Sequence, residues 1–197
     1  DSDGSIGKNY GFAGKISNAS INITKELPIR KLTMEISHVK NFDDDLFKFK
    51  IKKGFLYQLG LQNSEINLKR KKNEYQIDSL LYTNGKFQLS QFKKIISLFN
   101  INNESLKNIN GIVDLNTQFK FDINNRFKIK NPSTLTKGTI KYLETEIIGK
   151  KIFKKYIPSF NSKLVIKDTE IDFINTKKQQ ILNLKGLIKT KNTFDNF

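Results

Sequence analysis

The sequence contains no cysteine and no tryptophan, and it has only one histidine, one methionine and three prolines in 197 residues. Without cysteine the chain forms no disulfides, offers no thiolate ligands to a metal and has no cysteine nucleophile. It also lacks a glycine-rich phosphate loop, a GxSxG motif and the ligand spacing of a zinc site. We therefore expect no enzymatic activity, no cofactor and no metal site.

Long apolar runs are absent as well, because no segment approaches the roughly 20 apolar residues that a membrane-spanning helix requires. The chain begins at Asp1 rather than at methionine. We expect residues 1–197 to form a single β-rich domain that is a segment of a larger protein. A signal peptide or membrane anchor would then lie outside this segment.

The few side chains that could carry chemistry lack partners at useful spacings. His38 has no serine, cysteine or acidic residue at a recognisable distance, which indicates a surface or strand-end histidine. The acidic triplet 43–45 lacks the glycine and the spaced oxygen ligands of a calcium loop, so a solvated turn is expected. Asp168, Glu170 and Asp172 are spaced two apart, but an expected turn beside Asp168 interrupts their shared face.

The net charge is +16, from 35 Lys and Arg against 19 Asp and Glu. Such an excess indicates a nucleic acid or an anionic surface as partner. However, the abundance of Ile, Asn, Lys and Phe is also what an AT-rich coding sequence produces. A stacking platform for single strands needs rings and cations on one side. Here Phe47, Phe49 and Ile51 alternate with lysines that would face the other way, so we expect no nucleic acid partner.

Apolar and polar residues alternate with period two through most of the chain. In "LNTQFKFDINNRFKIKN" (115–131), Phe119 and Phe121 alternate with polar residues, Asn124-Asn125 interrupts, and the alternation resumes at Phe127. This pattern predicts a hairpin with one apolar and one polar face. Similar runs recur along the chain, with turn signals at 71–73, 83–85, 124–125 and 167–169.

The predicted fold is mainly β: an antiparallel meander of about a dozen strands with one or two short helices. The apolar spacing of 92–99, with Ser90 as N-cap, predicts one helix, and a stripe in 150–158 predicts a second. In "KLVIKDTEIDFIN" the apolar parity changes between Ile166 and Ile171. A turn or a bulge at 167–169 is needed to keep both on one face.

An antiparallel sheet with one apolar face must cover that face. A second sheet could pack on it to give a sandwich, which composition alone favours. Alternatively, the sheet could curl into an open groove or half-barrel whose lining holds a non-protein ligand. Two short helices are too few to cover a dozen strands.

Several segments resemble the AsmA-like proteins, the large envelope proteins of Gram-negative bacteria that include the AsmA, TamB and YhdP groups. The resemblance rests on alternating strands in "NASINITKELPIRKLTMEIS", "INGIVDLNTQFKF" and "KLVIKDTEIDFIN", and on strand starts such as "NGIVDL" (110–115) and "KGTIKYL" (137–143). It covers most of the chain through patterns of repeat and spacing.

This resemblance implies a β-groove in the periplasm, anchored in the inner membrane, that shields phospholipid acyl chains during lipid transport and outer-membrane homeostasis. Phospholipid, the inner membrane and envelope proteins would be its partners. The alternative is a structural or protein-interaction β-sandwich domain of an envelope or secreted protein, without a ligand. The residues expected to line the groove are Phe47, Phe49, Ile51, Leu115, Phe119, Phe121, Phe127 and Ile129.

Overall fold

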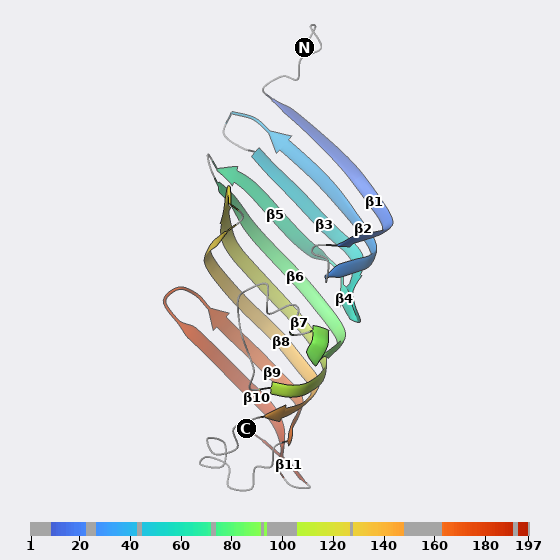
Figure 1. Ribbon diagram of the computed structural model, residues 1–197, viewed down its shortest axis with the longest axis vertical. Coiled ribbons are helices and arrows are strands. Elements are labelled where there is room, and N and C mark those ends of the chain that lie inside the picture. Colours follow the sequence, from blue (N-terminus) through green and yellow to red (C-terminus); the bar gives the residue numbers. More distant parts are fainter. Residues whose placement is uncertain are drawn as a thin grey trace.

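A computed structural model describes residues 9–22, 27–42, 45–71, 74–91, 93, 106–126, 128–147, 163–190 and 193–196. Within these ranges the chain forms a single antiparallel sheet of eleven strands, which confirms the predicted fold class (Figure 1). The strands are β1 (Tyr10–Asn22), β2 (Pro28–Lys40), β3 (Asp45–Leu56), β4 (Leu59–Leu61), β5 (Ser64–Lys71), β6 (Glu74–Gln88), β7 (Leu106–Asn124), β8 (Ile129–Ile147), β9 (Lys163–Asn175), β10 (Gln180–Thr190) and β11 (Thr193–Asn196).

The strands follow chain order from β1 at one edge to β11 at the other. The short strands β4 and β5 share one place in this order, because both lie between β3 and β6. In the described part of the chain no pairing joins the two edges, so the sheet is open and not a closed barrel.

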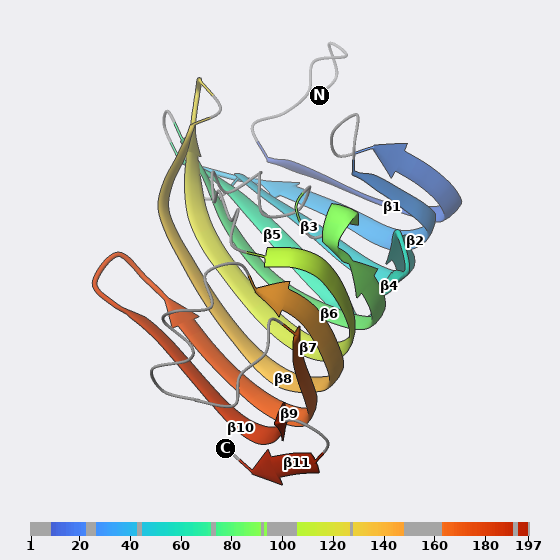
Figure 2. The ribbon, with the colours of Figure 1, turned by 60° about the horizontal axis from the view of Figure 1, so that its bottom comes forward.

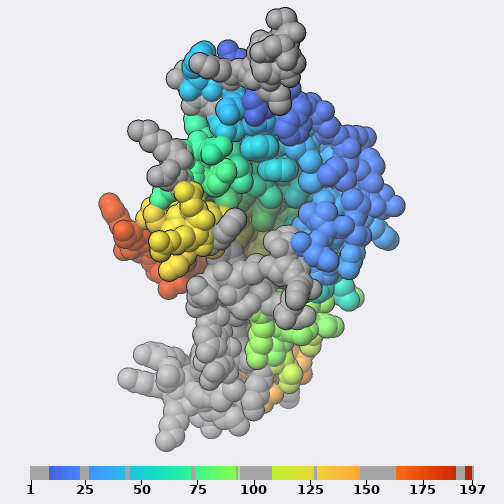
Figure 3. All heavy atoms as spheres, turned by 45° about the horizontal axis from the view of Figure 1, so that its top comes forward, coloured from blue at the N-terminus to red at the C-terminus, as the bar shows by residue number. Residues whose placement is uncertain are grey.

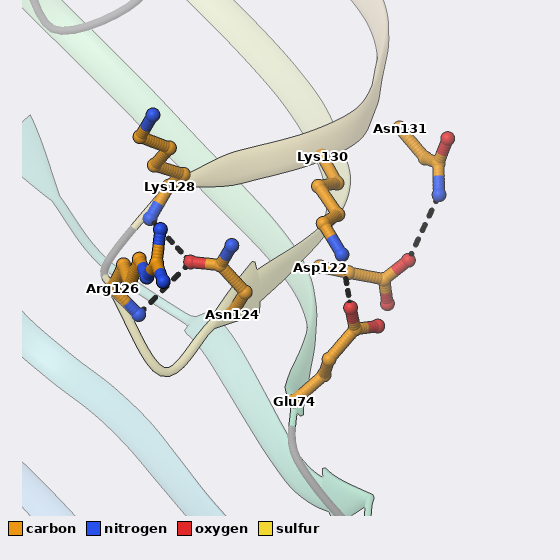
Figure 4. A network of polar contacts seen from close by, with 7 residues as sticks. All are labelled: Glu74, Asp122, Asn124, Arg126, Lys128, Lys130 and Asn131. Atoms are coloured by element: carbon orange, nitrogen blue, oxygen red, sulfur yellow. Dashed lines mark hydrogen bonds and ion pairs between the residues drawn. The ribbon is translucent and has the colours of Figure 1, made fainter.

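The predicted Asn124-Asn125 turn is confirmed, and it joins β7 to β8. The Oδ1 atom of Asn124 accepts hydrogen bonds from the backbone N–H groups of Arg126, at 3.0 Å, and of Lys128, at 2.9 Å (Figure 4). An asparagine side chain that binds the backbone ahead of it stabilises a turn. Beside this turn, the ammonium of Lys130 on β8 reaches the carboxylate of Glu74 on β6.

The turn predicted at 83–85 is wrong, because these residues lie inside β6. Gly85 has a φ of 126°, which other residues rarely adopt. A Cβ atom at Gly85 would lie 2.4 Å from the backbone oxygen of Gln58. The glycine therefore lets the turn at 57–58 approach β6 closely, and it bends β6 at this point. Residues 57–58 form a turn between β3 and β4, where Tyr57 has a φ of 57°.

A line of bulges crosses the sheet and bends its strands. Gly85 pairs with Val113, Val113 with Ile140, and Ile140 with Thr169. Register shifts lie beside this row between β7 and β8 and between β9 and β10. Further shifts lie between β1, β2 and β3, where Lys31 has a φ of 51°. Because a bulge bends its strand and increases its twist, a line of bulges curls the whole sheet (Figure 2).

The alternative of a bulge at 167–169, rather than a turn, is confirmed. Strand β9 continues from Lys163 to Asn175, and Asp168 within it has a φ of 44°. The extra residue restores a common face for Ile166 and Ile171, which pair with Ile188 and Leu184 of β10. The parity change in the sequence thus marks one of the bends of the sheet.

The apolar face lies on the inside of the curl. Buried residues of this face gather in two clusters along the bend, one around Leu32 and Ile51 and the other around Val113, Ile140 and Ile166. Residues of the opposite parity at the bend, such as Lys52 beside Ile51 and Lys141 beside Ile140, are exposed. We name the two sides the inner face and the outer face.

Both predicted helices fall largely or wholly outside the described residues. Residues 89–91 and 93 are helical, so this helix begins before Ser90, the predicted N-cap, and the rest of the predicted 92–99 segment is not described. The whole of 150–158 also lies outside. Among the residues that the structure describes, no helix has both the length and the apolar character needed to cross a bilayer.

Candidate functional site

Strand register brings the predicted lining residues together on the inner face. One cross-strand row runs from Phe49 through Ile66 and Ser79 to Phe119. The next row runs from Phe47 through Leu68 and Ile77 to Phe121. Residues 70 or more positions apart in the sequence therefore form one continuous apolar surface across β3, β5, β6 and β7.

Three more of the predicted lining residues, Ile51, Leu115 and Ile129, also lie on this face. Ile51 is buried at the bend, at 4% exposure, and Leu115 packs against the cluster around Val113. Ile129 pairs with Ile123 near the end of β8 and is 41% exposed. Phe127 lies outside the described residues.

Exposure increases from the bend towards the ends of the strands. Phe47, Phe49, Phe119 and Phe121 are half-buried, whereas the residues at the bend are buried. At the edge of the sheet, Phe12 on β1 reaches 53% exposure. In the space-filling view, β3 to β6 (cyan and green) lie recessed between β1 and β2 (blue) and the end of the β7–β8 hairpin (yellow) (Figure 3). The apolar face is thus hollowed: its side chains are buried at the bend of the sheet and more exposed towards the strand ends.

Hydroxyl groups on the inner face bond to protein atoms rather than pointing free into the hollow. The Thr136 hydroxyl donates to that of Thr117 at 3.1 Å, between β8 and β7. The Ser79 hydroxyl donates to the Phe119 carbonyl at 3.4 Å, and that of Thr169 to the Lys167 carbonyl at 2.9 Å. Satisfied hydroxyls of this kind leave an interior that behaves as largely apolar.

Of the two alternatives expected for His38, the surface position is wrong: His38 lies two residues before the end of β2, and its side chain is buried, at 4% exposure. Its Nε2 atom lies 2.8 Å from Oδ1 of Asp45, whose other oxygen is 3.7 Å from Nη1 of Arg70. Asp45 begins β3 rather than occupying a solvated turn, which corrects that part of the expectation for 43–45. The other two residues of the triplet lie outside the described ranges.

Aromatic rings enclose His38 at the end of the inner face. The Phe47 ring stacks on the imidazole at 3.9 Å with an interplanar angle of 15°, and Tyr10 and Phe12 pack at 5.4 and 5.3 Å. Nδ1 of His38 is buried without a hydrogen-bond partner. The hairpin register could have revealed the Asp45 contact, since Lys40 pairs with Asp45 and His38 with Phe47.

The outer face carries the charges, as the alternation predicts. Its lysines pair with carboxylates on neighbouring strands, mostly between exposed side chains. Asp172 belongs to one such pair, and among the described residues no three side chains of the metal-binding types are grouped to hold an ion. The pairs are Lys52–Glu35 at 3.3 Å, Lys120–Asp78 at 2.9 Å, Lys137–Asp172 at 3.3 Å, Lys141–Asp114 at 3.6 Å, Lys163–Glu144 at 2.6 Å and Lys130–Glu74.

No protein-family model, no curated protein and no solved structure matches the chain. The resemblance to AsmA-like proteins therefore stays a prediction, and the geometry of the inner face is what bears on function.

Proposed function

We propose that the inner face shields acyl chains of phospholipid, as a segment of an AsmA-like lipid-transport protein. The observation that carries this proposal is the partly exposed apolar surface formed by Phe47, Phe49, Phe119 and Phe121 on the concave side of an open sheet. Within the described residues the strands form one sheet, with no second sheet packed on this side to make a sandwich.

The chemistry of the surface suits hydrocarbon. Burial of a CH₂ group contributes roughly 0.8 kcal/mol and requires no particular orientation. A wall of Phe, Ile and Leu side chains can therefore hold an acyl chain at many equivalent positions. The hydroxyls of Thr117 and Thr136 form a hydrogen bond with each other, so they do not require a polar partner from a bound acyl chain. Such a surface needs no catalytic group.

The cellular setting of the proposal rests on the sequence resemblance. It would place the chain in the periplasm, held at the inner membrane by a part of the protein outside these residues, and lipid movement would serve the outer membrane. Envelope proteins would be further partners.

A second candidate function follows from the same surface. An exposed apolar patch also suits a protein partner, and Phe12 and Leu182 on the inner face near the two edges are more than half exposed, at 53% and 55%. The domain would then be a protein-interaction module, without a ligand. The two functions predict different molecules on the inner face.

Site-specific photo-crosslinking in cells distinguishes them. A benzoylphenylalanine at Phe121 would face the hollow, whereas the same residue at the adjacent Lys120 would face outwards. Lys120 pairs with Asp78 on the outer face, so it provides a matched control one residue away. Crosslinked products would be extracted and identified by mass spectrometry.

We expect phospholipid to be captured at Phe121 and not at Lys120. Capture of protein alone at Phe121 would overturn the lipid proposal and support the interaction module. Equal lipid capture at both positions would mean unspecific membrane contact and would also overturn it.

A further inference from the structure

One region of the outer face departs from its pattern of paired charges. Where β8 and β10 end and β9 begins, three lysines and a single carboxylate surround a cavity of about 280 Å³. Elsewhere on this face the described ion pairs join one lysine to one acid. The cavity is lined by Tyr142, Glu144, Lys163, Val165, Lys167, Lys189 and Phe194.

Strand pairing assembles this cavity from four strands. Glu144 and Tyr142 of β8 pair with Val165 and Lys167 of β9. Lys189 of β10 pairs with Phe194 of β11, and the Phe194 ring reaches across β10 to the ammonium of Lys167 on β9. The lining residues of β8 and β9 share the parity of the outer face, so the cavity is separate from the apolar hollow.

The single carboxylate is already saturated. Lys163 donates to Oε1 of Glu144 at 2.6 Å, and the Tyr142 hydroxyl donates to Oε2 at 2.5 Å. These two hydrogen bonds, that of Lys163 first, hold the pKa of Glu144 below its ordinary value. The same carboxylate raises the pKa of Tyr142, so the phenol stays protonated as a donor. Glu144 thus neutralises Lys163 and has little capacity left for another cation.

Two further ammonium groups line the cavity, those of Lys167 and Lys189, and the charge of Lys189 is only the smallest of the effects that lower the pKa of Glu144. Lys167 lies over the Phe194 ring, with Nζ 4.8 Å from the centroid, and neither Lys167 nor Lys189 forms an ion pair with any described residue. Like charges held together repel each other, and a bound anion relieves that repulsion. Lysine is a common phosphate ligand in proteins.

We propose that this cavity binds a phosphate group, with Lys167 and Lys189 as its ligands. The group could belong to a soluble phosphate or to a lipid headgroup, and the cavity has room for a small substituent beside Phe194. The site does not depend on the proposed function of the inner face, because it lies on the opposite side of the sheet.

The test titrates the whole chain with inorganic phosphate and follows amide shifts by NMR. The variant Lys167→Gln with Lys189→Gln removes both ligands. The matched control, Lys48→Gln with Lys50→Gln, removes the same charge from exposed lysines on the outer face of β3. We expect the double cavity variant to bind phosphate at least about tenfold more weakly, since two charge-assisted hydrogen bonds are lost. The control should bind as the parent does.

A third variant gives a change in the opposite direction. Glu144→Gln removes the negative charge and releases Lys163, so phosphate should bind more tightly. No phosphate binding by the parent, or equal weakening in the cavity and control variants, would overturn the proposal. So would weaker binding by Glu144→Gln.

Flotation with vesicles identifies the source of the phosphate. Binding to phosphatidic acid vesicles that the cavity variant loses, with phosphatidylcholine vesicles as reference, assigns the site to an anionic headgroup. Vesicle binding that is unchanged or absent, together with lost binding of inorganic phosphate, assigns it to a soluble phosphate compound.

Discussion

The two faces of this sheet are built from alternate residues of the same strands, yet they differ in how they contribute to stability. At the bend of the inner face, Leu32 is fully buried and Thr136 bonds to Thr117. On the outer face, Lys120 and Asp78 pair while each remains about half exposed, at 50% and 43%. Burial removes apolar area from water, whereas water and salt weaken an exposed ion pair. The fold therefore depends on the inner face, and the outer face is free to carry charge.

The largest expected effect comes from shortening a buried side chain at the bend. Leu32→Ala leaves a cavity in the inner cluster and should lower the free energy of unfolding by about 3 kcal/mol. Leu80→Ala changes the same residue type on the outer face, where Leu80 is 46% exposed, and should cost roughly 0.5 kcal/mol. Urea unfolding followed by circular dichroism measures both. Similar losses in the two variants would mean that the faces do not differ.

An intermediate effect is expected at the charged end of the inner face. Asp45→Ala leaves the buried His38 ring without its hydrogen-bond partner and should cost about 2 kcal/mol. Adding His38→Phe removes the polar group itself, so the double variant should regain most of that loss. Chemical denaturation of the parent, the two single variants and the double variant tests this. If the double variant is as unstable as the two single changes added together, the pair contributes nothing as a pair.

The smallest effect is expected on the outer face. Lys120→Met breaks the 2.9 Å contact with Asp78 and should change the free energy of unfolding by less than about 1 kcal/mol. In about 1 M salt the difference should nearly vanish, because the Debye length falls to roughly 3 Å. Thermal unfolding at low and high salt measures it. A large loss that persists in high salt would show that outer-face pairs act like buried ones.

Much of the fold could be predicted from local pattern. Alternation around Phe47 and Phe119 assigned these residues to one face, because successive side chains in a strand point to opposite sides. Asn124-Asn125 marked a hairpin, and the parity change between Ile166 and Ile171 marked a bulge. The wrong prediction at Gly85 arose from a contact between residues that are distant in the sequence. Gly85 was read as a turn, but it serves a close approach of Gln58, which lies in the turn between β3 and β4.

The contacts that were missed depend on residues from different strands. The pairing of His38 with Asp45 requires the register of the β2–β3 hairpin, and the Thr117–Thr136 bond requires that of β7 and β8. The cavity around Lys167 and Lys189 needs four strands in register. No motif in the sequence marks these sites, because each partner is an ordinary strand residue.

The sequence by itself determined that the chain forms antiparallel strands with an apolar and a charged face, since side-chain period and turn chemistry are local. The tertiary structure alone decided that the strands form one sheet, that a line of bulges beside Gly85 and Asp168 curls it, and that the apolar face lies inside the curl. Curvature arises only when bulges in separate strands come into line, and that alignment is set by pairing between strands.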